Sequence, residues 1–310
     1  MNATKFNNIC FNGNEAIEVY KESLNHKREL AFTQEILAIS YKIHIGDKGE
    51  LFINKSFDKL KKIIDDKKND ADLYAFFQKR RLFYKKNVFN EGLSNYKNES
   101  LKRSIKIIGC NNFEGIVLDL GANDNLLGKV LKETQKTVKK VIGVDIKKRN
   151  PYINEPFVSF VLQDSLSKIP VESLSIDSIV IRFALHHMDF DNQQKIIQEA
   201  YRVLKNRGKL IIVEDTFCEE YTPILHNRLS FEFQKLSYNS KLLVLSFLDA
   251  SSCFIYEEEM PFYFSYRSIE EWRKILEEAG FKERSIDYWG IPFFSLFQAP
   301  LGILIFEKKL

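Results

Sequence analysis

Cysteine is scarce in this chain, and its spacing excludes two common roles. The 310 residues contain four cysteines, at positions 10, 110, 218 and 253, and none of them forms a C-x-x-C pair. Neither a disulfide framework nor a zinc site of the usual ligand spacing is therefore expected. Isolated cysteines are typical of proteins from a reducing compartment.

Long apolar runs are also lacking. No segment approaches the ~20 consecutive apolar residues needed to span a bilayer, so no membrane span is expected. The amino terminus carries Asn2, Thr4, Asn7 and Asn8 instead of the apolar core of a signal peptide. With 45% hydrophobic and 28% charged residues, the composition is typical of a globular protein. A cytoplasmic protein with one large α/β domain and an appendage is expected.

Glycine is sparse where a nucleotide-binding fold would use it most. Residues 116–120 (Ile-Val-Leu-Asp-Leu) predict a strand, residues 126–131 a helix, and residues 141–145 (Val-Ile-Gly-Val-Asp) a second strand. This βαβ unit places Asp145 at the carboxyl end of its second strand. An acidic residue there can accept hydrogen bonds from the hydroxyls of a ribose.

The turn of this unit excludes one class of nucleoside ligand. A dinucleotide site needs G-x-G-x-x-G, so that the backbone can approach a pyrophosphate at the helix N-terminus. Residues 121–125 read Gly-Ala-Asn-Asp-Asn, with one glycine, and Asp124 would repel a phosphate. An acidic turn tolerates the ammonium and sulfonium groups of S-adenosylmethionine.

The same turn resembles motif I of the class I methyltransferases, D-x-G-x-G-x-G. Here Asp119 and Gly121 match, whereas Asn123 and Asn125 replace the other two glycines. Asparagine is among the residues that best tolerate a positive φ. We therefore expect Asn123 or Asn125 to adopt that conformation and the turn to keep its shape.

Further segments resemble later motifs of that family, in the family's order. They are a third strand with Asp164 at its end (157–165), a fourth strand followed by Ala-Leu-His-His-Met (176–188), an Arg-Val-Leu-Lys turn into a fifth strand (202–215), a Glu-Glu-Trp to Ala-Gly-Phe helix (270–281) and a closing apolar run (302–306). The resemblance covers about residues 100–310. Within the family, the chain resembles the small-molecule branch that includes ubiquinone and menaquinone biosynthesis enzymes.

The resemblance implies a doubly wound α/β fold. Its sheet would have seven mostly parallel strands with the last strand antiparallel, and S-adenosyl-L-methionine would be the cofactor. The positions that match the family's cofactor residues are Asp119, Gly121, Ala122, Asn123, Asp145, Ile146, Asp164, Ser165, Arg182 and Phe183. No metal site is expected.

Two histidines and an arginine follow the fourth strand. His186 and His187 are the catalytic candidates, because imidazole titrates near neutral pH and can accept a proton from an acceptor. Adjacent residues on a turn are expected to diverge, so one would face the acceptor, with His186 slightly favoured, and the other would pack. Arg182 could hold a carboxylate of the cofactor or substrate, or pair with Asp145 or Asp164.

The remaining sequence predicts two additions to the methyltransferase domain, which is placed at 111–310. Residues 1–110 have helical apolar spacing at 31–39, 57–64 and 73–77, and they carry a net charge of +7 against −3 for the rest. They would form part of the acceptor pocket or contact a second copy in a homodimer. Residues 216–267 are too long for a simple loop, and they resemble the lid that this fold inserts after strand five. The basic run at 79–81 is more typical of a solvated helix face than of a nucleic-acid site.

These patterns favour methyl transfer to a small biosynthetic acceptor at oxygen, nitrogen or carbon, with nucleic acid an unfavoured partner. One alternative is an RNA or protein methyltransferase that uses the basic amino-terminal region. The other is a non-catalytic protein that keeps the fold as a binding platform, for which the two Gly-to-Asn departures are the support.

Overall fold

The computed structural model describes residues 19, 21–22, 25–65, 75–76, 78–79, 82–83, 86, 93–147, 157–220, 227–256, 263–294 and 299–309. The chain forms two compact units. A sheet unit contains residues 96–218, 267–289 and 301–310, and a helical unit contains residues 1–95, 219–266 and 290–300.

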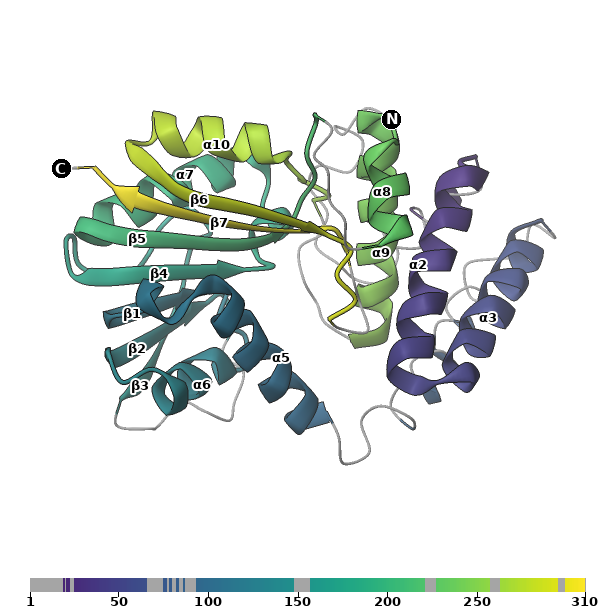
Figure 1. Ribbon diagram of the computed structural model, residues 1–310, viewed down its shortest axis with the longest axis horizontal. Helices are drawn as coiled ribbons and strands as arrows, with labels where there is room; N and C mark the ends of the chain where they lie inside the picture. Colours follow the sequence, from purple (N-terminus) through teal and green to yellow (C-terminus); the bar gives the residue numbers. More distant parts are fainter. Residues whose placement is uncertain are drawn as a thin grey trace. The chain divides into compact units, whose positions relative to one another are not determined.

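The sheet unit is built on a seven-stranded sheet in the order β3-β2-β1-β4-β5-β7-β6 (Figure 1). Strands β1 to β5 pair in parallel, and β7 is antiparallel to β5. The predicted seven-stranded fold with an antiparallel last strand is confirmed. The strands are β1 (Gly115–Leu120), β2 (Val138–Asp145), β3 (Val158–Leu162), β4 (Ile176–Arg182), β5 (Leu204–Asp215), β6 (Phe281–Gly290) and β7 (Leu301–Lys308).

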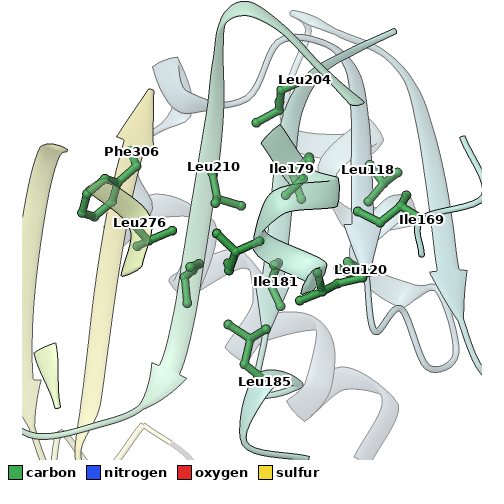
Figure 2. Close-up of a cluster of buried hydrophobic side chains, with 14 of the residues drawn as sticks. Leu118, Leu120, Ile169, Ile179, Ile181, Leu185, Leu204, Leu210, Leu276 and Phe306 are labelled. Atoms are coloured by element: carbon green, nitrogen blue, oxygen red, sulfur yellow. The ribbon is translucent and has the colours of Figure 1, made fainter. Parts of the chain in front are cut away.

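Helices cover both faces of this sheet (Figure 1). The central strands are apolar on both faces, as expected of parallel strands buried on two sides. One face packs against α7 (Phe190–Val203) and α10 (Ile269–Glu278), and Figure 2 shows part of this core, including Leu118, Leu120, Ile179, Ile181 and Leu276. The other face packs against α5 (Leu93–Ile108) and α6 (Leu126–Thr134).

Local sequence fixes where two of these helices begin. Ser268 and Glu271 form a capping box at the start of α10, where each side chain accepts the other's backbone N–H. Asp189 caps α7 by accepting from the backbone N–H of Asn192 at 2.7 Å.

The strand order reverses between β1 and β4. In an open α/β sheet the ligand site lies outside the carboxyl ends of the strands at such a switch point. Residues that follow β1, β2 and β4 are therefore the ones on which a functional site should be built.

The boundary between the units differs from the one expected at 110/111. The compact units divide at 95/96, because α5 belongs with the sheet. Its residues Leu101, Ile105 and Ile108 are buried beside Val117 and Val130. Helix α5 therefore belongs to the core of the sheet unit.

The helical unit joins segments that are far apart in the sequence. It contains α2 (Lys27–Ile45), α3 (Asp47–Asp65), α8 (Arg228–Gln234) and α9 (Tyr238–Tyr256). The Ser240 hydroxyl donates to Glu29 at 2.6 Å, and the Phe32 and Phe233 rings stack at 6.4 Å. The described part of the segment after β5 thus contains two helices, α8 and α9, which pack with the amino-terminal helices.

Several sequence predictions lie outside the described residues. They concern much of the helix expected at 73–77 and part of the basic run at 79–81. In the portion that is described, no helix is both long and apolar enough to cross a membrane.

Candidate functional site

The turn after β1 has the backbone that the sequence predicted. Gly121, Asn123 and Asn125 have φ angles of 78°, 51° and 60°, so the positive φ expected for Asn123 or Asn125 is confirmed at both positions. The backbone N–H groups of Gly121 and Ala122 donate to the carbonyl oxygen of Val144 at 2.8 and 3.1 Å. The turn is therefore anchored to the end of β2.

Glycine at position 121 is required for a second reason besides its φ angle. A Cβ added there would lie 2.7 Å from the Cβ of Ala184, which follows β4. The motif turn and the segment after β4 therefore approach each other closely, at the switch point of the sheet.

Asn123 and Asn125 differ in their surroundings, although the sequence analysis predicted the same backbone conformation for either of them. Asn123 is half-buried, whereas Asn125 is fully buried and its Nδ2 lies 3.4 Å from the carbonyl oxygen of Ser159. A Cβ at Gly143 would lie 2.4 Å from Oδ1 of Asn125. Gly143 in β2 therefore makes room for the Asn125 side chain, a role that the sequence analysis did not identify.

A pair of substitutions at Asn123 tests the backbone argument. Asn123→Gly should leave cofactor affinity within about twofold of the wild type, because glycine adopts a positive φ without strain. Asn123→Val should weaken it by about tenfold, because a β-branched residue at this φ costs on the order of 1–3 kcal/mol. Calorimetric titration with S-adenosylhomocysteine measures both affinities. Equal affinities for the two variants would contradict the account.

The Asp124 carboxylate lies at the start of α6. Its Oδ1 accepts a hydrogen bond from the backbone N–H of Leu126 at 3.2 Å, at the first residue of α6. The N–H groups at this helix end are those that would bind a phosphate in a dinucleotide fold. A carboxylate that already occupies this position supports the exclusion drawn from the sequence.

Asp145 lies at the carboxyl end of β2 and braces the turn. Its Oδ2 accepts from the backbone N–H of Asn123 at 2.8 Å, and its Oδ1 accepts from that of Lys147 at 3.0 Å. A carboxylate has about four lone-pair positions, and the residue is half-exposed. Asp145 therefore has the capacity to accept ribose hydroxyls while it holds the turn.

The other residues expected beside the nucleoside lie at the same edge of the sheet. Ile146 follows β2 and is half-buried, whereas Asp164 and Ser165 follow β3 and are exposed. The backbone N–H of Gln163 donates to the carbonyl oxygen of Asp145 at 2.8 Å, so the ends of β2 and β3 are joined.

A buried charge pair lies between β1 and β4. Asp119 pairs in register with Val180, and Arg182 pairs with Val213, so both side chains project from the face of the sheet that carries α5 and α6. Burial raises the pKa of Asp119 to about 7, against the opposing effect of Arg182, and Asp145 and Asp124 raise it further. Burial lowers the pKa of the Arg182 guanidinium, and Asp119 and Asp124 oppose that shift.

The partner of Arg182 was not among those weighed from the sequence. Arg182 interacts electrostatically with Asp119 and Asp124, whereas Asp145 and Asp164 were the expected partners. Within the described part of the chain, Nε of Arg182 is buried and has no hydrogen-bond partner. A buried donor of this kind calls for an acceptor supplied by a ligand or by water.

The raised pKa of Asp119 predicts a pH dependence of stability. Because it exceeds the ordinary value of 3.8, the folded protein binds this proton more tightly than the unfolded chain does. The resulting stabilisation is fully present below about pH 3.8 and is lost as the pH rises through about 7. Asn at position 119 is neutral throughout. The melting temperature of the wild type, relative to that of Asp119→Asn, should therefore fall by at least about 3 °C between pH 4 and pH 8. A melting-temperature difference between the two proteins that is constant over this pH range would contradict a raised pKa of the buried Asp119 carboxyl.

The segment after β4 is held by a carboxylate that the sequence analysis missed. Glu214, at the end of β5, is 1% exposed. Its Oε2 accepts from the backbone N–H of Leu185 at 2.8 Å, and its Oε1 lies 2.5 Å from Nδ1 of His186. Oε1 also accepts from the backbone N–H of Asp215 at 2.9 Å. Since the carboxylate accepts from these N–H groups, Nδ1–H of His186 is the donor in the third contact.

Gln193 of α7 fixes the same segment from another side. Its Nε2 donates to the carbonyl oxygens of Leu185 and Met188 at 2.9 and 3.3 Å, and its Oε1 accepts from Nε of Arg267 at 2.7 Å. The short helix η4 (Leu185–His187) is therefore rigidly placed.

The histidines do not diverge as expected. The rings of His186 and His187 lie 4.1 Å apart and are tilted by 48°. The expectation that the two rings point apart is wrong, since they lie in contact although consecutive residues of a 3₁₀ turn start about 120° apart. His186 is buried and His187 is half-buried.

A signal for Glu214 was present in the sequence. Asp119, Asp145 and Glu214 each follow an apolar run that forms a central parallel strand, and the carboxyl ends of such strands share one edge of the sheet. The run Ile-Ile-Val-Glu at 211–214 matches this pattern, so the rule applied to β1 and β2 would have identified Glu214 as well.

The chain is similar in sequence to known methyltransferases. Residues 118–212 match the family model of a methyltransferase domain. An uncharacterized methyltransferase of Bacillus subtilis, YcgJ, is 31% identical over 166 residues, which is 50% of this chain and 60% of YcgJ. The tRNA N(3)-methylcytidine methyltransferase trm140 of Schizosaccharomyces pombe is 30% identical over 150 residues, which is 45% of this chain and 44% of that protein.

Solved structures resemble the chain at low sequence identity. The human N-acetylserotonin methyltransferase in complex with S-adenosylmethionine is 14% identical with a TM-score of 0.46, and the match covers 78% of this chain and 57% of the human chain. The present chain spans less than two thirds of the length of the two sequence relatives above.

Proposed function

We propose that this chain, which contains a class I S-adenosylmethionine-dependent methyltransferase domain, transfers a methyl group from that cofactor to a small-molecule acceptor at oxygen, nitrogen or carbon. The observation that carries the proposal is the turn after β1. Asn123 and Asn125 keep its positive-φ backbone, and the carboxylate of Asp145 braces it.

The residues at this edge of the sheet suit the cofactor. Asp145 would accept the ribose hydroxyls, and Asp164 with Ser165 would lie near the adenine. The amino acid part of the cofactor carries both an ammonium and a carboxylate. Asp119 provides a negative charge once it ionises, at about pH 7, and Arg182 provides a positive charge. The buried Nε of Arg182, which has no hydrogen-bond partner within the described chain, offers a donor for the carboxylate.

Bound S-adenosylmethionine would supply an activated methyl group on a sulfonium. For such a transfer the protein has to align the acceptor with the methyl group and exclude competing nucleophiles. Gly121 and Ala184 set the close approach between the turn and the segment after β4. The acceptor atom would therefore be presented from the side of the residues that follow β4.

The His186–Glu214 pair suits proton acceptance from a hydroxyl or amine acceptor. Since Glu214 engages Nδ1, the atom that would accept the proton is Nε2 of His186. A buried carboxylate on the opposite ring nitrogen fixes the tautomer and stabilises the imidazolium that forms. Glu214 is in this view a positioning residue, and His186 is the general base.

A small-molecule acceptor is favoured by the residues after β4. They read Arg-Phe-Ala-Leu at 182–185 and lack the Asn-Pro-Pro-Tyr motif that holds a planar amine in nucleic-acid and protein methyltransferases. These residues therefore favour a small biosynthetic acceptor over the planar amine of a nucleic acid or protein.

The second candidate is an RNA methyltransferase. The similarity to a tRNA methyltransferase and the net charge of +7 in residues 1–110 favour it. An electrostatic RNA site would lose affinity steeply as salt rises.

One experiment separates these functions. The protein is incubated with methyl-labelled S-adenosylmethionine and, in parallel, with total RNA or with a protein-free small-molecule extract. Label in the small-molecule fraction is expected. Label in RNA would favour the second candidate, and binding of the cofactor without transfer to either fraction would favour a non-catalytic binding platform.

A further inference from the structure

Phe183, the first residue after β4, has a backbone conformation that is unfavourable for its side chain. Its φ angle is 49°. A positive φ is uncommon in residues other than glycine, asparagine and aspartate, and for a bulky side chain it is an outlier. Such strain persists only where the surroundings enforce it, and it clusters at functional sites.

The surroundings of Phe183 hold this conformation from both sides. Its backbone N–H donates to the carbonyl oxygen of Val213 at 2.9 Å. The next residue, Ala184, faces Gly121 of the motif turn, and Leu185 is tied to Glu214. The chain is therefore fixed immediately before and after Phe183, at the edge of the sheet where the cofactor residues meet.

The ring of Phe183 stays accessible in spite of this fixed backbone. It is 38% exposed, and among the exposed large apolar side chains in the described part of the sheet unit it is the one aromatic. The Arg182 guanidinium carbon lies 5.4 Å from the ring centroid, which is within the range of a cation–π contact. The guanidinium supports the ring and leaves part of it open to a ligand.

We propose that Phe183 is a specificity residue on whose ring a planar, electron-rich aromatic acceptor, such as a phenol, stacks during methyl transfer. The inference rests on the function proposed above, and it names the acceptor class. A rigid ring offers a preformed platform, because little side-chain freedom is lost when an aromatic partner packs against it. A cation beside the ring draws electron density from it and favours an electron-rich partner.

The family resemblance placed Phe183 among the cofactor residues, and in that role its ring would contact the sulfonium of the cofactor through its face. The two roles differ in what a change at Phe183 affects. An acceptor platform alters aromatic binding and leaves cofactor affinity intact, whereas a sulfonium contact weakens the binding of S-adenosylmethionine itself.

The test uses two variants and a matched control in the full-length protein. Phe183→Asn removes the ring and suits the positive φ, and Phe183→Tyr keeps the ring. Leu174→Asn is the control, because Leu174 also has a positive φ of 55° and is 54% exposed, but it precedes β4. Both Asn variants should have melting temperatures equal to or above that of the wild type, since asparagine relieves the strain.

Binding is then measured by calorimetry with 2-naphthol, in protein saturated with S-adenosylhomocysteine. Decahydro-2-naphthol, which keeps the hydroxyl and the approximate size but lacks an aromatic face, is the comparison ligand. We expect the wild type, Phe183→Tyr and Leu174→Asn to bind 2-naphthol alike and to prefer it to the saturated alcohol. Phe183→Asn should bind 2-naphthol about three- to tenfold more weakly. Its affinity for S-adenosylmethionine should stay within twofold.

Four results would overturn the inference: no 2-naphthol binding by the wild type, equal binding of the two alcohols, unchanged 2-naphthol affinity in Phe183→Asn, or weaker binding of S-adenosylmethionine in that variant. A wild type that binds neither S-adenosylmethionine nor S-adenosylhomocysteine would overturn the proposed function itself, and the two failures are thereby distinguished.

Discussion

Replacement of His186 by alanine is expected to lower turnover by about 10²–10⁴-fold, the usual contribution of a general base. The affinity for S-adenosylhomocysteine should change by less than threefold, because the residues that would hold the nucleoside follow β1, β2 and β3. Turnover is measured on whichever acceptor the wild-type protein methylates, and affinity by calorimetry.

The neighbouring residues supply the controls. His187→Ala should retain turnover within about tenfold, although the two rings lie 4.1 Å apart. Glu214→Gln keeps the shape of the side chain but removes the charge that would stabilise an imidazolium. It should lower kcat with little effect on KM for the cofactor. Wild-type turnover in both His186→Ala and His187→Ala would mean that the histidines are structural. The base would then be sought at Tyr263, Tyr266 or His226, of which His226 lies outside the described residues.

Replacement of Asp145 by alanine should weaken cofactor binding by roughly tenfold to a hundredfold. Hydrogen bonds to a charged group contribute about 1.5–3 kcal/mol. Part of this loss would come from the turn, because Asp145 also accepts from the backbone N–H of Asn123. Calorimetry with S-adenosylhomocysteine and with adenosine separates the contributions of ribose and turn from those of the amino acid part.

Asp145→Asn is the matched variant. This variant keeps an oxygen that can accept from the Asn123 N–H, but it has no charge. The decrease in cofactor affinity should therefore be smaller than in Asp145→Ala. Unchanged cofactor affinity in Asp145→Ala would mean that the nucleoside does not lie at the end of β2.

The fold was predictable because its signals are local and ordered. Apolar runs ending in Asp119 and Asp145 gave β1 and β2, and the Glu-Glu-Trp to Ala-Gly-Phe segment at 270–281 gave most of α10. The positive φ at Asn123 and Asn125 followed from the known tolerance of asparagine.

The parts of the site that depend on packing between distant segments were not predictable. Nothing near Gly143 in the sequence indicates that its missing side chain accommodates Asn125. The contact between Glu214 and His186 joins residues 28 positions apart, and the partner of Arg182 depends on the register of β1 against β4. Adjacent residues on a turn were expected to diverge, whereas the rings of His186 and His187 lie in contact.

The boundary of the amino-terminal region also depends on packing between segments that are distant in the sequence. Helical spacing indicates a helix at residues 99–108, but it does not say which unit that helix joins. Burial of Leu101 and Ile105 against the sheet decides it.

The most direct measurement of the central claim is calorimetric titration of the wild-type protein with S-adenosylmethionine, with NAD⁺ as the comparison ligand. The account predicts one saturable site for S-adenosylmethionine, weakened in Asp145→Ala, and no binding of NAD⁺, because Asp124 occupies the helix N-terminus that a pyrophosphate would need. Absence of S-adenosylmethionine binding at millimolar concentration, or saturable binding of NAD⁺, would contradict it.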